Sequence, residues 1–186
     1  MIENELKYVL RLDSQEAIKE NCGSPYLIRQ GYLPGKARIR SKWQRGSDNT
    51  PAFFFTYKLP VKNVLQEDVV FEIEKDITQH EFDTLWPHTD RRLTKLRYVL
   101  KIDRVQWDID YFFDGDRLYF AMAECEMPED MSAPPSIPEF ISAAVVYAVP
   151  RGETKTYTSG RIADPTYAKK LAASLKKPKA KKKRSA

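Results

Sequence analysis

Polar and apolar side chains alternate at every second residue along much of the chain, which is typical of half-buried strands. The pattern predicts eight strands, over residues 3–11, 26–33, 36–43, 52–59, 69–76, 92–102, 104–113 and 117–127. No long helical segment alternates with these strands. The pattern therefore favours a mainly β (α+β) fold, an antiparallel sheet or closed β-barrel with a few peripheral helices.

A few short helices are predicted between and after the strands. The sequences at 13–16 and 78–81 resemble capping boxes, in which an acceptor side chain precedes a Glu by three residues. The first should open a helix that stops near Gly23. Residues 139–149 are mostly apolar and read as a third helix. A last helix should start at Asp164-Pro165, an N-cap followed by proline.

Charged residues share one face of most predicted strands, with apolar residues at the opposite parity. The same-face sets are Glu3/Glu5/Lys7, Arg38/Arg40, Glu72/Glu74, Lys95/Arg97, Asp108/Asp110 and Glu124/Glu126, and Lys58 lies alone on its strand. If these faces pointed outward, the sheet would be an ordinary solvated one. If the sheet closed with them inward, it would enclose a polar tunnel.

A tunnel of this kind would need partners for its desolvated charges. Carboxylates without His or Cys select hard cations such as Mg²⁺ or Mn²⁺, and Arg and Lys bind phosphate oxygens. The mixture therefore suits a metal-bound polyphosphate. The sequence has no Gly-x-x-x-x-Gly-Lys loop, which argues against a P-loop nucleotidase.

Composition predicts one soluble domain. The chain has 186 residues, of which 42% are hydrophobic, enough for one sizeable core. Two distant cysteines, Cys22 and Cys125, fit a reducing compartment. The apolar run at 141–149 is far shorter than the roughly 20 residues of a membrane helix, and the first residues do not resemble a signal peptide. We therefore expect a cytoplasmic protein without a membrane partner, or a nuclear one if the source is eukaryotic.

Basic residues dominate the end of the chain. Nine lysines and arginines and no acids follow residue 168, although the whole chain has a net charge of only +5. We expect a domain over residues 1–168 and a disordered tail over 169–186. The tail could serve nuclear import, contact nucleic acid or another polyanion, or simply be a solvated terminus.

Several segments resemble, in order, the conserved blocks of the CYTH superfamily, the triphosphate tunnel metalloenzymes. The Glu-x-Glu-x-Lys signature is met by Glu3, Glu5 and Lys7, and the similarity covers roughly residues 2 to 160. The other blocks are residues 28–33, 37–40, 56–58, 78–87, 95–98, 108–110 and 124–126.

The resemblance implies an eight-stranded antiparallel tunnel that binds a triphosphate. Family members hydrolyse inorganic tripolyphosphate, thiamine triphosphate or other triphosphates, and one branch makes cyclic AMP from ATP. Residues 30–33 and 85–87 are more similar to the small bacterial-type triphosphatases than to the cyclase branch. We therefore expect a metal-dependent triphosphatase; a class IV type adenylate cyclase and a non-catalytic polyphosphate- or nucleotide-binding module are the alternatives.

Together the residue pattern and the resemblance assign two sets of side chains. The expected phosphate-binding residues are Lys7, Arg38, Arg40, Lys58, Lys95 and Arg97, with Lys155 added from the family's C-terminal Lys and Tyr, here Lys155 and Tyr157. The expected ligands of Mg²⁺ or Mn²⁺ are Glu3, Glu5, Glu72, Asp110, Glu124 and Glu126. The Lys and Arg side chains would neutralise the phosphate oxygens during phosphoryl transfer.

The chain also departs from the family pattern. Val70 stands where related triphosphatases have the first of two acids on the fifth strand. Thr154, Ser159 and Gly160 stand where an acid and an Asn are expected near the C-terminal Lys and Tyr. The resemblance implies one or two bound metals, and these differences predict a weaker site for the second metal or a different choice of substrate.

Overall fold

Nine strands form one sheet in the computed structural model, which describes residues 4–44, 46, 48–62, 68–131 and 136–175. The strands are β1 (Glu5–Leu10), β2 (Tyr26–Tyr32), β3 (Ala37–Gln44), β4 (Ala52–Lys62), β5 (Asp68–Asp76), β6 (Arg91–Ile102), β7 (Val105–Asp114), β8 (Arg117–Glu126) and β9 (Val145–Val149). The α-helices are α1 (Gln15–Cys22), α2 (Gln79–Leu85), α3 (Glu139–Ser142), α4 (Ser159–Ile162) and α5 (Pro165–Leu175). Short 3₁₀ turns cover Leu12–Ser14, Pro34–Lys36, Trp86–His88 and Arg151–Thr156.

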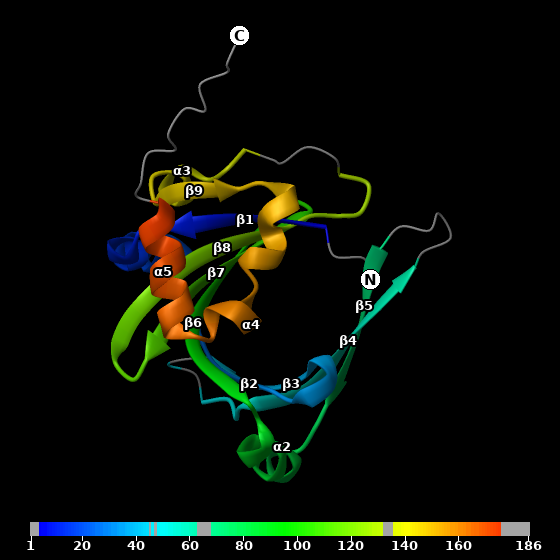
Figure 1. The fold of residues 1–186 in the computed structure, drawn as a ribbon. Helices are drawn as coiled ribbons and strands as arrows, with labels where there is room; N and C mark the ends of the chain where they lie inside the picture. Colours follow the sequence, from blue (N-terminus) through cyan, green and yellow to red (C-terminus); the bar gives the residue numbers. More distant parts are fainter. Residues whose placement is uncertain (1–3, 45, 47, 63–67, 132–135, 176–186) are drawn as a thin grey trace.

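All neighbouring strands are antiparallel, in the order β5-β4-β3-β2-β6-β7-β8-β1-β9. The sheet curves strongly, with β1 and β9 at the top and β4 and β5 at the right in Figure 1. Within the described ranges no ladder joins the edge strands β5 and β9. The predicted antiparallel β fold is confirmed, and the sheet seen here is open.

The prediction of a helix over residues 139–149 is wrong in its second half. Only Glu139–Ser142 is helical, and Val145–Val149 forms β9, the ninth strand, which pairs with β1. The run Val145-Val146-Tyr147 has the β-branched and aromatic residues that favour strands. Tertiary pairing with the free edge of β1 therefore decides a segment that the apolar pattern left ambiguous.

Two of the three predicted N-terminal helix caps are formed. Thr78 and Glu81 form a complete capping box at α2, and Asp164 Oδ1 accepts from the Thr166 N–H at 2.8 Å at the start of α5. The predicted capping box at 13–16 is not formed. Ser14 instead donates to the Arg11 carbonyl and contacts the Tyr111 hydroxyl at 2.8 Å, although α1 does stop at Gly23 as expected.

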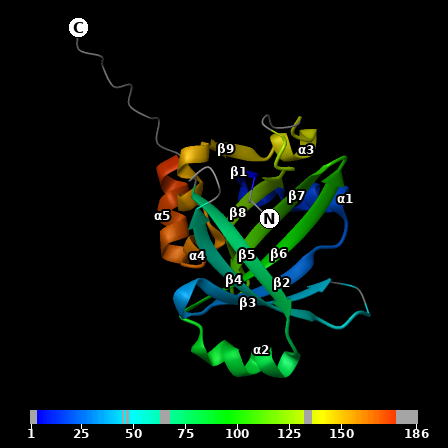
Figure 2. The ribbon, with the colours of Figure 1, turned by 90° about the vertical axis from the view of Figure 1, so that its right-hand side faces the viewer.

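Apolar side chains cover the outer face of the sheet. Trp107, Ile109 and Cys125 lie there in a buried cluster with Ile18 of α1 and Ile141 of α3. Figure 2 shows α2 below the sheet beside β3, with α1 and α5 on opposite sides. The alternating pattern thus leaves the charged residues for the inner face.

A second apolar cluster closes one end of that inner face. Phe112, Phe120 and Met122 have the same parity as the charged residues of β7 and β8, but they pack with Ile162 of α4 and Ala168 of α5. The inner face is therefore charged along only part of its length.

The C-terminal helix extends past the expected domain boundary. Lys169 and Lys170 belong to α5, which runs to Leu175, and residues 176–186 of the predicted tail lie outside the described residues. None of the described helices combines the length and apolar character needed to cross a bilayer.

Gly31 in β2 lies close to the side chain of Thr89, and a substitution at this position tests that contact. A Cβ at this position would lie 2.5 Å from Cγ2 of Thr89 and 3.0 Å from its Cβ. We expect Gly31→Ala to lower the free energy of unfolding by about 1–3 kcal/mol, measured by urea denaturation. Gly152→Ala is the matched control, because a Cβ there meets nothing within 4 Å.

A second substitution tests the cause of this loss. Thr89→Ser removes the closest methyl group and keeps the hydroxyl, which donates to the Trp86 carbonyl at 2.8 Å. Part of the stability should return when Thr89→Ser is combined with Gly31→Ala. A Gly31→Ala protein as stable as the wild type would show that the contact is relieved at no cost.

Candidate functional site

A cavity of about 660 Å³ lies against the inner face of the sheet, and seven strands and the segment at 155–160 contribute to its wall. Eight basic and five acidic side chains line it, so its described lining carries an excess of positive charge. The basic ones are Lys7, Lys36, Arg38, Arg40, Lys58, Lys95, Arg97 and Lys155. The acidic ones are Glu5, Glu72, Glu74, Glu124 and Glu126.

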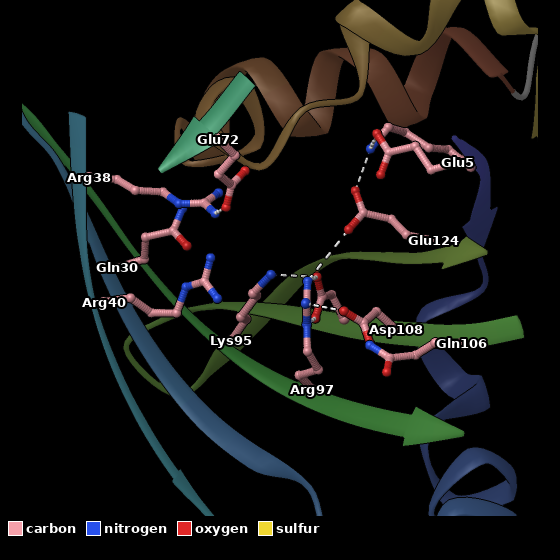
Figure 3. Close-up of polar contacts among 12 residues, drawn as sticks. Glu5, Gln30, Arg38, Arg40, Glu72, Lys95, Arg97, Gln106, Asp108 and Glu124 are labelled. Carbon is pink, nitrogen blue, oxygen red and sulfur yellow. Dashed lines mark hydrogen bonds and ion pairs between the residues drawn. The ribbon is translucent and has the colours of Figure 1, made fainter. Parts of the chain in front are cut away.

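Strand geometry explains why these residues meet. Side chains two residues apart share a face, and the antiparallel register places opposite charges side by side. Lys7 is paired in register with Glu124, Arg97 with Asp110, and Lys58 with Glu72. The predicted inward orientation of the charged faces is therefore what the structure shows (Figure 3).

The centre of the sheet holds a buried ion cluster. Asp110 is 0% exposed, receives a hydrogen bond from Lys95 Nζ at 2.5 Å, and is bound by Arg97 through Nε at 2.7 Å and Nη2 at 2.6 Å. Arg97 also pairs with Asp108. Burial alone would raise the pKa of Asp110, but Arg97 and Lys95 hold it below its ordinary value. Burial and the adjacent Arg97 lower the pKa of Lys95 to about 8.

Asp110 therefore does not fit the predicted role of metal ligand. It is not among the residues that line the cavity, and Lys95 and Arg97 occupy its oxygens. Its position fits a buried counter-ion that fixes two cations.

Lys7 joins two of the other predicted metal ligands. Its Nζ lies 2.8 Å from Glu5 Oε1 and makes a short hydrogen bond to Glu124. Burial opposes the charge of Lys7, but Glu124 and Glu5 outweigh that effect and raise its pKa. Glu124 is likewise disfavoured by burial, yet Lys7 and Arg97 lower its pKa to about 2. Both groups are thus charged in the folded protein at neutral pH.

The opposite wall is less completely neutralised. Glu72 forms ion pairs with Arg38 Nη2 at 2.8 Å and with Lys58 Nζ at 2.9 Å. Arg40 Nη2 lies 3.9 Å from Glu74 Oε2. The Nε atoms of Arg38 and Arg40 are buried and have no hydrogen-bond partner among the residues described. Burial, with Arg38 and Arg97 close by, lowers the pKa of Arg40 to about 10. Two buried donors of this wall therefore have no acceptor among the described residues.

Glu126 stands among other acids. It lies opposite Glu5 across β1 and β8, and burial together with Asp108 raises its pKa from 4.5 to about 7 despite Arg97 nearby. Its charge is therefore only partly present at neutral pH.

The carboxylates fit a metal that arrives with phosphate better than a preformed metal cage. Glu3 lies outside the described residues, and the described part of the chain has no group of three or more metal-ligating side chains. Glu5 and Glu126 are adjacent across the strand pair. Two carboxylates of this kind suit Mg²⁺, which completes its octahedron with water and substrate phosphate oxygens.

Several lining residues were not singled out from the sequence. Lys36 precedes Arg38 by two residues, so its strand phase could have revealed it, although it lies in a turn with a positive φ of 70°. Gln30 lies beside Arg40 in register and donates to the Tyr32 hydroxyl at 2.5 Å. Both polar groups add to the wall of the cavity.

The C-terminal block is placed only in part as expected. Lys155 lines the cavity, together with Thr158, Ser159 and Gly160. Tyr157 does not, because it is buried in the second apolar cluster. Val70 lies in β5 opposite Pro60. The described lining of the cavity includes two acids of β5, Glu72 and Glu74.

Comparison with known proteins gives distant structural similarity alone. No family model and no curated protein matches the sequence. The PH1012 protein of Pyrococcus horikoshii is 14% identical with a TM-score of 0.45, covering 70% of this chain and 80% of that one. A candidate adenylate cyclase of Bacillus halodurans is 12% identical with a TM-score of 0.48, covering 76% and 96%. A chain of the Schizosaccharomyces pombe Mediator head module is 11% identical with a TM-score of 0.48, covering 78% of this chain and 90% of that one. These values assign neither a family nor an activity.

The raised pKa of Glu126 predicts a pH-dependent effect on stability. The folded chain binds this proton more tightly than the unfolded chain, so the contribution of Glu126 is favourable at low pH and is lost as pH rises through about 7. Glu126→Gln carries no charge at any pH. Because the carboxyl is only partly buried and solvent screens its charge, we expect a gain of only about 1 kcal/mol in the free energy of unfolding at high pH.

The measurement is urea denaturation at pH 5 and pH 8, with the exposed Glu20→Gln as control. The gain from Glu126→Gln should be larger at pH 8 than at pH 5. An equal effect at both values would contradict the assigned electrostatic cause.

Proposed function

We propose that this chain binds a triphosphate in the cavity and hydrolyses its terminal phosphoanhydride with Mg²⁺ or Mn²⁺, inorganic tripolyphosphate being the preferred substrate. Thiamine triphosphate and nucleoside triphosphates are related candidates. The observation that carries the proposal is the pair of buried Nε atoms of Arg38 and Arg40, which have no hydrogen-bond partner in the described part of the chain, on a wall with excess positive charge. Buried donors of this kind call for an acceptor that is itself anionic.

A phosphate chain would supply that acceptor. Each guanidinium presents several N–H donors in a plane, which matches the oxygens of a phosphoryl group. Arg38 and Arg40 would bind from β3, with Lys58, Lys36 and Lys155 around them. Their charges would be placed before the reaction and would stabilise charge that develops on the phosphoryl oxygens.

The central ion cluster would have a different task. Lys95 and Arg97 are held by Asp110, so their charged groups would have fixed positions beside the substrate. Fixed charges need little reorganisation during the reaction. Lys7, held between Glu5 and Glu124, would mark the edge of this ion cluster.

A metal ion would be held by Glu5 and Glu126, with Glu124 nearby, and would supply Lewis-acid chemistry at the phosphoryl group when bound. The proposal includes membership of the CYTH superfamily and a tunnel closed around the ligand. Glu72 of the edge strand β5 already contributes to the same cavity as Lys7 of β1, which supports such an enclosed arrangement.

A non-catalytic binding module is the second candidate. It is favoured by the ion pairs that already engage Glu5, Glu72 and Glu124, and by the lack of a three-ligand metal group among the described residues. The two candidates share the phosphate-binding wall and differ in turnover.

Binding is tested first, by calorimetric titration of tripolyphosphate. We expect Arg40→Gln to weaken binding at least about tenfold, because charge-assisted hydrogen bonds from a buried guanidinium are lost. Arg104→Gln is the control, since Arg104 is exposed and pairs with Asp130. Unchanged binding by Arg40→Gln, or no binding by the wild type, would sink the proposed site.

Turnover is tested by phosphate release from tripolyphosphate, thiamine triphosphate, ATP and GTP, each with Mg²⁺ and Mn²⁺. We expect metal-dependent release that Glu5→Gln lowers at least about 100-fold, while the exposed Glu139→Gln does not. Tight binding without release under any condition would favour the binding module. Cyclic AMP and pyrophosphate formed from ATP would instead favour a cyclase.

A further inference from the structure

A second cavity of about 290 Å³ adjoins the first. The two share Arg40, Arg97 and Glu126 in their walls, so these side chains form the boundary between them. The remaining lining residues of the second cavity are Tyr26, Ile28, Lys42, Val99, Lys101, Gln106 and Asp108. It lies on the side of the ion cluster away from Phe112 and Phe120, since Lys101 and Gln106 are at the other ends of β6 and β7.

The second cavity is also positive. Four basic side chains, Arg40, Lys42, Arg97 and Lys101, face two acids, and one of these acids is already bound. That acid, Asp108, pairs with Arg97 and accepts from Gln106 Nε2 at 2.9 Å. The described lining of the cavity therefore also has cations in excess of acids.

Lys42 is packed as a half-buried cation. Its Nζ lies 4.1 Å from the centre of the Tyr26 ring. Burial, with Arg97 and Arg40 nearby, lowers the pKa of Lys42. An anion between Lys42 and Arg40 would relieve this repulsion between like charges.

The cations of β3 connect the two cavities. Arg38 lines the first cavity, Arg40 lines both, and Lys42 lines the second. At two-residue spacing these three positions span about 13 Å along the strand. The second cavity is slightly smaller than usual for a complete ligand site, which suits the extension of a ligand held next to it.

We infer that the substrate class extends to linear inorganic polyphosphate longer than tripolyphosphate, whose additional phosphates pass Arg40 and occupy the second cavity near Lys42 and Lys101. The inference rests on the proposed function, because the first phosphates would be bound in the first cavity. It adds a site and a preference for chain length that binding of a triphosphate does not require.

The test compares tripolyphosphate with a defined linear polyphosphate several times longer, by calorimetric titration of the full chain. Lys42→Gln with Lys101→Gln should lower the affinity for the long chain relative to tripolyphosphate by about tenfold, through the loss of two partly exposed ionic contacts. Lys169→Gln with Lys170→Gln removes the same charge from the exposed surface of α5 and should leave that ratio unchanged. Lys101→Glu, at an exposed position, should act in the same direction without disturbing Tyr26 packing.

The outcomes separate the two proposals. If the wild type does not bind tripolyphosphate, the proposed function fails and this inference fails with it. If it binds tripolyphosphate but neither Lys42→Gln with Lys101→Gln nor Lys101→Glu changes the ratio, the second cavity is not part of the site and only this inference is overturned. An equal change in the control pair would show that overall charge alone determines the preference.

Discussion

The strand pattern places cations in the interior, and the structure depends on acidic partners that neutralise them. Alternation places Lys95 and Arg97 on the inner face of β6, where Lys95 is only 2% exposed. Charges this deeply buried are tolerated only with good partners. Asp110 on the neighbouring strand provides them, and its complete burial shows how little water reaches this point. Removing that single carboxylate would leave two buried cations without their main partner.

The acids are distributed unevenly around the inner face. β7 and β8 carry Asp108, Asp110 and Glu124, which engage the cations of β1 and β6. On β3, Arg38 and Arg40 lie opposite Tyr32 and Gln30 of β2, neither of which is an acid. Their counter-ions come from the edge strand β5. One wall is thus complete without a ligand and the other is not. In the proposed function, an anion would complete the wall at β3 and a metal would be held between β1 and β8.

Sequence reasoning predicted the parts of this arrangement that depend on period. Charged residues at two-residue spacing indicated the inner face of six of the predicted strands, and Thr78 with Glu81 indicated the start of α2. Period could not reveal which charges neutralise one another, because pairing depends on strand order. The sequence therefore predicted Asp110 as a metal ligand and could not reveal its pairing with Lys95 and Arg97. Val145–Val149 was misread because its fate depends on the free edge of β1, which lies far away in sequence.

Along β7 and β8 the inner face changes from polar to apolar, and this gradient separates structural charges from available ones. On β7 the inner residues run from Gln106 through Asp108 and Asp110 to Phe112, and on β8 from Glu126 through Glu124 to Met122. Charges next to the apolar end lose most of their hydration and must be paired within the fold. Those toward the other end keep some contact with water and can exchange partners at lower cost. A ligand that enters from the polar end would therefore meet exchangeable charges first and the fixed ion cluster last.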